Sequence, residues 1–255
     1  MTTYPNCKIN LGLRILNRRP DGYHDLETVF VPVTSLCDEL EIAPANGGET
    51  RMVQEGLALD NAPADNLCLR AYNLLQAEFG LPPVTIRLHK RIPFGSGLGG
   101  GSSDAAFTLK MLNTMFALGL DDCELERRAA RLGADCPFFV RNRTAYATGI
   151  GDHLQPVDLA LERYRIEVAI PEGEAVSTRE AYASLDLGST HKAPTLLQSL
   201  QRPALEWRNT VINDFEATVL PAHPAIAAMK AEMYRRGAVY AAMSGSGAAV
   251  FGLFE

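Results

Sequence analysis

The residues best suited to chemistry form a glycine-rich stretch near the middle of the 255-residue chain. Residues 93–104 read Pro-Phe-Gly-Ser-Gly-Leu-Gly-Gly-Gly-Ser-Ser-Asp, with five glycines within seven positions. Glycines allow several backbone N–H groups to turn toward one point, because no Cβ atom blocks the approach of a ligand. The first turn of a following helix adds unpaired N–H groups and a dipole, which stabilise an anion by about 0.3–1 kcal/mol per interaction. The stretch therefore predicts a cradle for a polyphosphate.

Three other interpretations of this stretch are less consistent with its context. Gly95-x-Gly97-x-x-Gly100 matches the dinucleotide-binding pattern, but that fold ends its second strand in an acid about 20 residues later. Here the acids at that distance, Asp121 and Asp122, fall between two predicted helices. A Walker loop requires a lysine, and none follows these glycines. A flexible linker would not separate a strand pattern from a helix pattern, so we favour the cradle, whose two final serines can hold a phosphate or its Mg²⁺.

A lysine and an asparagine share one face of a predicted strand near the N-terminus. Apolar residues occupy every second position from Cys7 to Ile15, which is the period of a strand with one buried face. Lys8 and Asn10 lie on the opposite face. Lys8 is either a solvated edge lysine or a cation for a ligand, and Asn10 either orients a ligand or caps the strand end.

Asp135 is the strongest candidate for a general base. It follows a predicted helix and precedes the apolar residues 137–139, so its carboxylate would have an apolar surround. However, an aspartate beside glycine and proline is commonly a helix cap. The residues themselves leave both roles open.

Several polar and aromatic residues lie beside predicted turns. Tyr23 and His24 follow an Asp-Gly turn, where they either face a ligand or lie on the surface. Residues 244–247, Ser-Gly-Ser-Gly, either bind phosphate through backbone N–H groups or form an ordinary hairpin turn. The acids in the segment 213–216, Asn-Asp-Phe-Glu, are expected on the solvated face of a helix.

Hydrophobic periodicity predicts the elements that must position these residues. Strands are predicted over residues 7–15, 28–36, 38–43, 49–55, 84–88, 143–148 and 164–170. Helices are predicted over residues 67–79, 104–118, 124–132, 178–185, 210–219 and 225–236. Residues 238–254 predict either a hairpin or a strand with a tight glycine turn. In this prediction the glycine stretch connects a strand to a helix.

Composition narrows the class of protein. With 47% hydrophobic and 21% charged residues, the chain is typical of a folded enzyme. A net charge of −6 and the lack of a long basic run argue against a nucleic-acid partner. The five scattered cysteines predict reduced thiols rather than disulfides or a zinc site. Without a secretory pattern or a run of about 20 apolar residues, we expect a cytoplasmic protein with no membrane partner.

Three separate stretches together resemble the GHMP kinases, which include galactokinase and the homoserine and mevalonate kinases. The matching stretches are residues 7–11 (Cys-Lys-Ile-Asn-Leu), 93–104 and 243–248 (Met-Ser-Gly-Ser-Gly-Ala). Residues 19–26 (Arg-Pro-Asp-Gly-Tyr-His-Asp-Leu) and 132–139 (Leu-Gly-Ala-Asp-Cys-Pro-Phe-Phe) resemble the members that act on a cytidine-diphosphate-linked methylerythritol. The sequence departs from that pattern at Cys136, where valine is expected, and ends eight residues after Gly247.

The resemblance implies a two-lobed α+β fold with mixed sheets, in which ATP and the acceptor bind in the cleft between the lobes. We predict an N-terminal lobe over residues 1–157, which contains the glycine stretch, and a C-terminal lobe over 158–255. The implied reaction is transfer of the γ-phosphoryl group of ATP, with Mg²⁺, to the tertiary 2-hydroxyl of the acceptor, in the methylerythritol phosphate route to isoprenoid precursors. We expect a monomer or a weak homodimer.

The resemblance also implies roles for single residues. Asp135 would accept the hydroxyl proton, and Lys8 would keep that base ionised and neutralise the moving phosphoryl group. The residues implied for the substrate are Asn10, Tyr23, His24, Tyr182, Ser244 and Gly245, with Tyr23 and Tyr182 covering the two faces of cytosine. Those implied for the nucleotide are Pro93, Phe94, Gly95, Ser96, Gly97, Leu98, Gly99, Gly100, Gly101, Ser102, Ser103 and Asn66, and Ser103 would also contact Mg²⁺. A helix cap explains Asn66 equally well.

Three alternative functions make different predictions. A homoserine- or mevalonate-type kinase would not need the pair Tyr23 and His24. A non-catalytic nucleotide-binding sensor on the same fold predicts loss of Lys8 or Asp135, and both residues are present. A dinucleotide oxidoreductase would bind NADH, which we do not expect.

Overall fold

A computed structural model describes residues 1–45, 47–57, 66–185 and 194–255. Contacts divide the chain into two compact units. Unit 1 comprises Met1–Cys7, Thr34–Phe94 and Gly99–Arg143, and unit 2 comprises Lys8–Val33, Gly95–Leu98 and Thr144–Glu255. These units alternate along the sequence, and the division into residues 1–157 and 158–255 stays a prediction.

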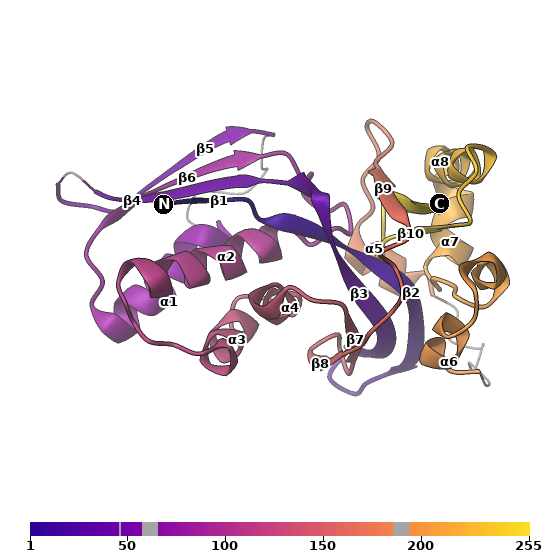
Figure 1. The fold of residues 1–255 in the computed structure, drawn as a ribbon, viewed down its shortest axis with the longest axis horizontal. Helices are drawn as coiled ribbons and strands as arrows, with labels where there is room; N and C mark the ends of the chain where they lie inside the picture. Colours follow the sequence, from indigo (N-terminus) through magenta and orange to yellow (C-terminus); the bar gives the residue numbers. More distant parts are fainter. Residues whose placement is uncertain (46, 58–65, 186–193) are drawn as a thin grey trace. The chain divides into compact units, whose positions relative to one another are not determined.

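Unit 1 contains a four-stranded mixed sheet covered on one face by helices (Figure 1). Its strands lie in the order β1 (Thr2–Thr3), β4 (Glu39–Pro44), β6 (Val84–Lys90) and β5 (Arg51–Gly56). The central strand β6 pairs antiparallel with β4 and parallel with β5, and its alternate residues are buried. The helices are α1 (Leu67–Phe79), α2 (Gly100–Met115), α3 (Asp122–Ala130) and α4 (Cys136–Arg141). Helix α1 ends at Gly80 in the left-handed conformation, as its sequence predicts.

Helix α2 begins four residues earlier than its apolar periodicity predicts. Gly99 adopts the left-handed conformation at the N-cap, and the N–H of Ser103 donates to the carbonyl of Gly99 at 2.9 Å. The apolar pattern begins only at residue 104, because glycine and serine have no apolar side chain to contribute to it. The two serines that end the glycine stretch therefore lie in the first turn of α2.

Unit 2 contains two antiparallel sheets with helices around them. One has the order β2 (Asn6–Arg18), β3 (His24–Cys37), β7 (Ala145–Thr148) and β8 (His153–Pro156), and the first two strands continue at one end into residues of unit 1. The other has the order β10 (Tyr240–Met243), β11 (Val250–Phe254) and β9 (Arg165–Ala169). The helices are α5 (Thr178–Ala183), α6 (Leu196–Leu200), α7 (Glu216–Ala222), α8 (Pro224–Arg235) and the 3₁₀ helix η2 (Ala204–Asn209).

Mixed sheets with helices confirm the predicted α+β class. The hairpin predicted over residues 238–254 is confirmed by β10 and β11, whose residues Ala242 and Phe251 pair in register. The single helix predicted over 210–219 is wrong, because the chain there leaves η2 and enters α7 only at Glu216. Among the described residues, no helix has the length and apolar character needed to cross a membrane.

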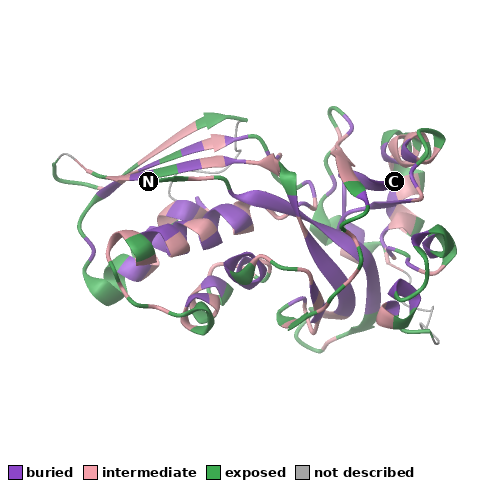
Figure 2. Ribbon diagram, viewed as in Figure 1, coloured by how far each residue is buried: buried purple, intermediate pink, exposed green. Residues whose placement is uncertain are grey.

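Strand β2 is buried on both faces, which differs from the one-faced strand that its alternation predicts. All residues from Asn6 to Ile15 are buried (Figure 2). The side of the strand that carries Lys8 and Asn10 is no more exposed than the apolar side, with 4% and 3% of these residues accessible. The interpretation of Lys8 as a solvated edge lysine is therefore wrong.

Candidate active site

Three of the motif segments meet within unit 2. The hydroxyl of Ser244 donates to the carbonyl of Gly97 at 3.0 Å, and the N–H of Asn10 donates to the same hydroxyl at 3.2 Å. Gly97 has a φ of +78°, and a Cβ atom on it would lie only 2.1 Å from the carbonyl oxygen of Ser244. Only glycine permits this approach. The strand β2, the glycine stretch and the loop between β10 and β11 are thus held together.

A chain of hydrogen bonds orients the buried ammonium of Lys8. Its Nζ atom donates to Oδ1 of Asn10 at 2.5 Å and lies 4.8 Å from the ring centroid of Phe30. The amide of Asn10 donates in turn to Oγ1 of Thr28 at 3.1 Å, and that hydroxyl donates to the carbonyl of Gly12 at 2.5 Å. Lys8 and Asn10 are therefore fixed as a pair beside Gly97 and Ser244.

The structure brings Tyr182 to His24, although no local pattern marks Tyr182. The two rings stack with centroids 4.7 Å apart and an interplanar angle of 20°, and Phe215 meets Tyr182 edge-on. Tyr23, by contrast, is 61% exposed at the hairpin turn. Burial and the nearby charge of Arg18 lower the pKa of His24, so its imidazole is neutral at pH 7 and can both donate and accept a hydrogen bond.

The start of α2 in unit 1 has the features of an anion site. No side chain of the described residues caps this helix, so its first N–H groups have no intrahelical or side-chain partner at the cap. A Cβ atom on Gly100 would lie 2.8 Å from Cγ2 of Ile92, so glycine is needed for the helix to approach the residues that follow β6. The oxygen Oγ of Ser103 is buried and has no hydrogen-bond partner in the described part of the chain.

Cys136 lies beside Ser102, and burial explains why a thiol is compatible with this position. A Cβ atom on Gly133 would lie 3.3 Å from Sγ of Cys136 and 3.9 Å from Oγ of Ser102. Burial raises the pKa of the Cys136 thiol to about 11, and a hydrogen bond with Ser102 opposes this only in part. The thiol therefore stays protonated at pH 7 and occupies the position as a small uncharged side chain, as valine would.

Asp135 and Asn66 both precede a helix, but only one of them caps it. Oδ1 of Asn66 accepts from the N–H of Cys68 at 2.8 Å, so the capping explanation of Asn66 is confirmed, and its contact with a nucleotide stays a prediction. Asp135 is half-buried, and among the described residues its carboxylate makes no capping hydrogen bond to α4. The capping explanation of Asp135 is therefore wrong. Asp135 belongs to unit 1 and Lys8 to unit 2, and their pairing stays a prediction.

Comparisons with known proteins decide the family. The N-terminal domain of the GHMP kinases matches residues 66–143, and the C-terminal domain of these kinases matches residues 196–255. A protein of Bacteroides thetaiotaomicron named 4-diphosphocytidyl-2-C-methyl-D-erythritol kinase is 51% identical, over 100% of this chain and 92% of that protein. The chain belongs to the GHMP kinase family. The protein of the same name from Porphyromonas gingivalis is 44% identical over 100% of this chain and 92% of its own length.

Solved structures agree with this membership. A crystal structure of 4-(cytidine 5'-diphospho)-2C-methyl-D-erythritol kinase superposes with a TM-score of 0.83 and 34% identity, over 99% of this chain and 90% of that chain. The mevalonate kinase of Methanococcus jannaschii has a TM-score of 0.71 at 14% identity, over 100% and 90% of the two chains, which shows the shared fold alone. This GHMP kinase is thus an enzyme that phosphorylates a small molecule, as its motifs predict.

A buried cluster of three charges in unit 1 of this kinase was not predicted from the sequence. The ammonium of Lys90 donates to Oδ2 of Asp104 at 2.8 Å and to Oδ2 of Asp38. Oδ1 of Asp38 accepts from the N–H groups of Arg91 and Ile92 at 2.6 and 2.8 Å. Burial raises the pKa of Asp104 to about 7, because one ammonium does not compensate two buried carboxylates, and Oδ1 of Asp104 has no partner among the described residues. Residues so distant in sequence form no local pattern that could have revealed the cluster.

The prediction for the acids of the segment 213–216 also differs from the structure. Asp214 and Glu216 are half-buried rather than solvated, and each accepts a hydrogen bond from a backbone N–H group, of Ile15 and Met243 respectively, both at 2.7 Å. The expectation that these acids lie on a solvated helix face is therefore wrong. The signal that could have raised doubt is the pair of short polar side chains at 213 and 214, which commonly bond to backbone.

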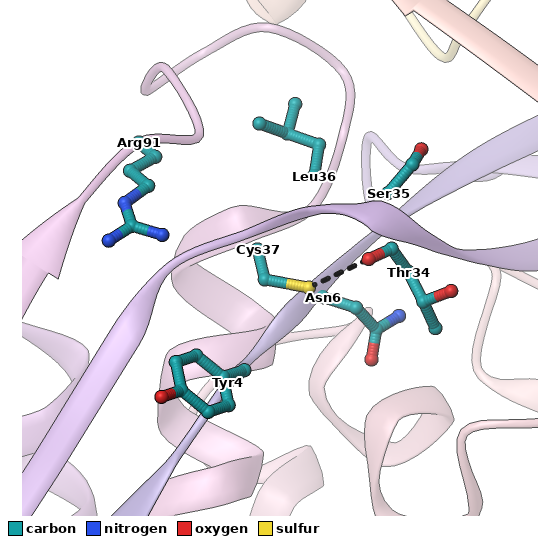
Figure 3. A pocket seen from close by; sticks show the side chains of 7 residues that line it. All are labelled: Tyr4, Asn6, Thr34, Ser35, Leu36, Cys37 and Arg91. Carbon is teal, nitrogen blue, oxygen red and sulfur yellow. Dashed lines mark hydrogen bonds between the residues drawn. The ribbon is translucent and has the colours of Figure 1, made fainter.

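Unit 1 contains a pocket of about 560 Å³ (Figure 3). Its lining residues are Tyr4, Asn6, Thr34, Ser35, Leu36, Cys37 and Arg91. Three of its polar side chains already have partners: the thiol of Cys37 donates to the carbonyl of Thr34, Asn6 pairs with Asn142, and Arg91 pairs with Glu39. It contains none of the residues that the motifs of the GHMP kinases nominate, and we assign it no role in the reaction.

Proposed function

We propose that this kinase transfers the γ-phosphoryl group of ATP to the 2-hydroxyl of 4-diphosphocytidyl-2-C-methyl-D-erythritol, in the methylerythritol phosphate route to isoprenoid precursors. The observation that carries the proposal is the contact of Ser244 with both Gly97 and Asn10, because it joins three motif segments at one place in unit 2. Relatives that match the chain from end to end are named 4-diphosphocytidyl-2-C-methyl-D-erythritol kinase, which supports the choice of acceptor.

The nucleotide phosphates bind to the glycine stretch and the start of α2. The uncapped N–H groups of that helix attract oxyanions, and glycines at 97 and 100 let the backbone approach closely. Mg²⁺ usually keeps several waters and contacts phosphates with only one or two protein oxygens. The unpartnered Oγ of Ser103 fits such a ligand. When bound, the metal neutralises charge on the β- and γ-phosphates.

Asp135 accepts the proton of the acceptor hydroxyl as the oxygen of that hydroxyl bonds to the γ-phosphorus. The bond between the γ-phosphorus and the bridging oxygen breaks, and ADP leaves with the bonding electrons. The role is supported because the carboxylate of Asp135 is half-buried and makes no capping hydrogen bond to α4. Lys8 stabilises the negative charge of the transferring group, and its hydrogen bond to Asn10 keeps its ammonium in place.

Aromatic rings hold the cytosine of the acceptor. The ring of Tyr23 is exposed, while Tyr182 contacts the rings of Phe215 and His24. A neutral imidazole at position 24 offers both a donor and an acceptor to the edge of the base. In the loop that carries Ser244 and Gly245, the N–H of Ser244 already donates to the carbonyl of Ala249 at 2.8 Å. Among the described residues of this loop, Gly245 offers a backbone N–H for an acceptor phosphate.

An assay of ATP consumption tests this function directly. The purified protein is expected to consume ATP with 4-diphosphocytidyl-2-C-methyl-D-erythritol and not with mevalonate or homoserine. Equal turnover of a control acceptor, or failure of cytidine diphosphate to compete, would favour another GHMP kinase activity. Binding of ATP with no turnover of any acceptor would favour a sensor. The cytoplasmic location and the monomer or weak homodimer stay predictions.

A further inference from the structure

The segment 213–216 connects β2 to the loop between β10 and β11. The N–H of Leu13 donates to the carbonyl of Ile212, and the N–H of Asp214 donates to the carbonyl of Leu13, both at 2.9 Å. Oδ2 of Asp214 accepts from the N–H of Ile15 at 2.7 Å. Three hydrogen bonds thus fix Ile212 and Asp214 against the same strand that carries Lys8 and Asn10.

The side chain of Asn213 holds the start of the loop from the other side. It is 3% exposed, and its amide nitrogen donates to the carbonyls of Met243 and Gly245, both at 2.8 Å. Its oxygen accepts from the N–H of Phe215 at 3.1 Å. Both amide protons and the oxygen are therefore used, and the two carbonyls flank Ser244.

Glu216 fixes the same loop through a different backbone group. Its Oε1 accepts from the N–H of Met243 at 2.7 Å, while its Oε2 accepts from Nζ of Lys230 at 2.5 Å. Met243 is thus held at its N–H by Glu216 and at its carbonyl by Asn213. Two side chains from one short segment determine where the loop leaves β10.

The loop that is held in this way has little room to shift. A Cβ atom on Gly245 would lie 3.3 Å from Oδ1 of Asn10 and 3.4 Å from Cα of Gly97, and Ser244 contacts both residues through its hydroxyl. Because reacting groups misplaced by about 1 Å can cost about 10²-fold in rate, the position of this loop matters for the reaction although Asn213 is not itself placed at the reacting atoms.

We propose that Asn213, assisted by Glu216, is a positioning residue of this kinase. It fixes the Ser244–Gly247 loop so that Ser244 and Gly245 stay against Gly97 and Asn10 when the acceptor binds. The role in the reaction rests on the proposed function, whereas the role in holding the loop rests on the hydrogen bonds alone.

The first test compares Asn213→Ala with Asn113→Ala. Asn113 is a matched control because its amide also bridges backbone groups, with the carbonyl of Leu120 at 2.9 Å and the N–H of Leu120 at 3.0 Å, but in unit 1 and far along the sequence from the loop. Both variants are expected to have a lower Tm. Only Asn213→Ala is expected to lower kcat/KM for the acceptor, by about 10- to 100-fold. An equal effect of the two variants on kcat/KM, or none, would overturn the proposal.

A second pair of variants isolates one hydrogen bond to the loop. Glu216→Ala and Glu216→Gln both remove the ion pair with Lys230, but only glutamine retains an oxygen for the N–H of Met243. We expect glutamine to lose clearly less kcat/KM than alanine at a similar Tm. Equal losses in the two variants would contradict a positioning role of Glu216.

Hydrogen exchange separates this proposal from the proposed function. In Asn213→Ala the peptide over residues 243–249 is expected to exchange at least about tenfold faster than in Asn113→Ala, because two of its anchoring hydrogen bonds are lost. Unchanged exchange would overturn the proposal whatever the activity. If the unmodified protein turned over no acceptor while this exchange increased, the proposed function would fail and the anchoring of the loop would stand.

Discussion

Each unit of this kinase buries a lysine to the same extent, yet the surroundings of the two lysines differ. Lys90 in unit 1 is 3% exposed, and its ammonium contacts the carboxylates of Asp38 and Asp104. Lys8 in unit 2 is 4% exposed, donates to the amide oxygen of Asn10 and lies over the ring of Phe30. Burial alone therefore does not tell a structural lysine from a functional one.

The partners of each lysine reveal the difference. The cluster around Lys90 joins the residue before β4, the end of β6 and the second turn of α2, and a Cβ atom on Gly100 would lie 3.2 Å from its Nζ. It holds the start of α2 in place. The hydrogen bonds around Lys8 lead to the loops that carry Gly97 and Ser244. We infer that Lys90 contributes to stability and Lys8 to the reaction.

The largest effect is expected from Asp135, which also belongs to unit 1. Asp135→Asn should lower kcat by about 10²–10⁴-fold, because a general base is lost, and should leave ATP affinity nearly unchanged. Steady-state kinetics and ATP titration measure the two quantities. Asp122→Asn, at an exposed acid of α3, serves as the control. A kcat equal to that of the unmodified enzyme would remove Asp135 from the mechanism.

Lys90→Met tests the inferred contribution of Lys90 to stability. Removing the ammonium leaves two buried carboxylates without their cation, which should lower the free energy of unfolding by about 3–5 kcal/mol. Urea denaturation measures this loss. Adding Asp104→Asn should restore part of it, because one of the uncompensated carboxylates is then neutral. A loss below about 1 kcal/mol, in the range of a surface ion pair, would show that the cluster does not stabilise unit 1.

Replacing Lys8 with methionine tests the other half of the comparison, the inferred role of Lys8 in the reaction. Lys8→Met should lower kcat by about 10²–10³-fold, as expected for the loss of one group that stabilises the transition state. Its free energy of unfolding should fall by less than that of Lys90→Met. Single-turnover kinetics and urea denaturation of the two variants decide the comparison, which is wrong if both lose the same stability or if Lys8→Met keeps its rate.

Sequence patterns predicted many of the regular elements, for a physical reason. Periodicity located β2, α1, β6 and the hairpin of β10 and β11, because burial of one side of each element imposes a local repeat. The glycine stretch was recognisable because positive φ and close backbone approach at residues such as Gly97 require glycine. Burial of one face and positive φ angles constrain residues that are close in sequence, so both can be recognised from the sequence.

The contacts that distinguish the two lysines could not be predicted in this way. Asp38, Lys90 and Asp104 come together only through the fold, and nothing near any one of them indicates the others. Asn213 holds backbone carbonyls, which every residue possesses, so its partners have no sequence signature. The alternation of β2 correctly placed Lys8 and Asn10 on one face but could not indicate that this face is also buried.

A smaller effect, on the KM for the acceptor, is expected from replacing one of two exposed tyrosines, one in each unit. Tyr23 in unit 2 is 61% exposed and Tyr4 in unit 1 is 58% exposed, so they form a matched pair. Tyr23→Ala should raise the KM for the acceptor about tenfold, within the roughly 1–3 kcal/mol of a lost stacking partner, and should spare the KM for ATP. Tyr4→Ala should change neither. Similar changes in the KM for both substrates of Tyr23→Ala would argue against stacking on cytosine.

A pH-dependent effect on stability tests whether Lys90 compensates both carboxylates of the charge cluster. The pKa of Asp104 is raised from 3.8 to about 7 by burial, although Lys90 opposes the shift. The folded protein therefore keeps the proton of Asp104 up to about pH 7, whereas the unfolded chain releases it near pH 4. The bound proton stabilises the folded state at low pH, and this stabilisation is lost as the pH rises from about 4 to about 7. Asparagine cannot titrate. Between pH 5 and pH 8 the unfolding free energy of the unmodified protein should therefore fall by about 1–3 kcal/mol relative to that of Asp104→Asn, as urea denaturation at each pH can measure. Parallel pH profiles for the two proteins would mean that Asp104 is ionised within the cluster, and that Lys90 compensates both carboxylates after all.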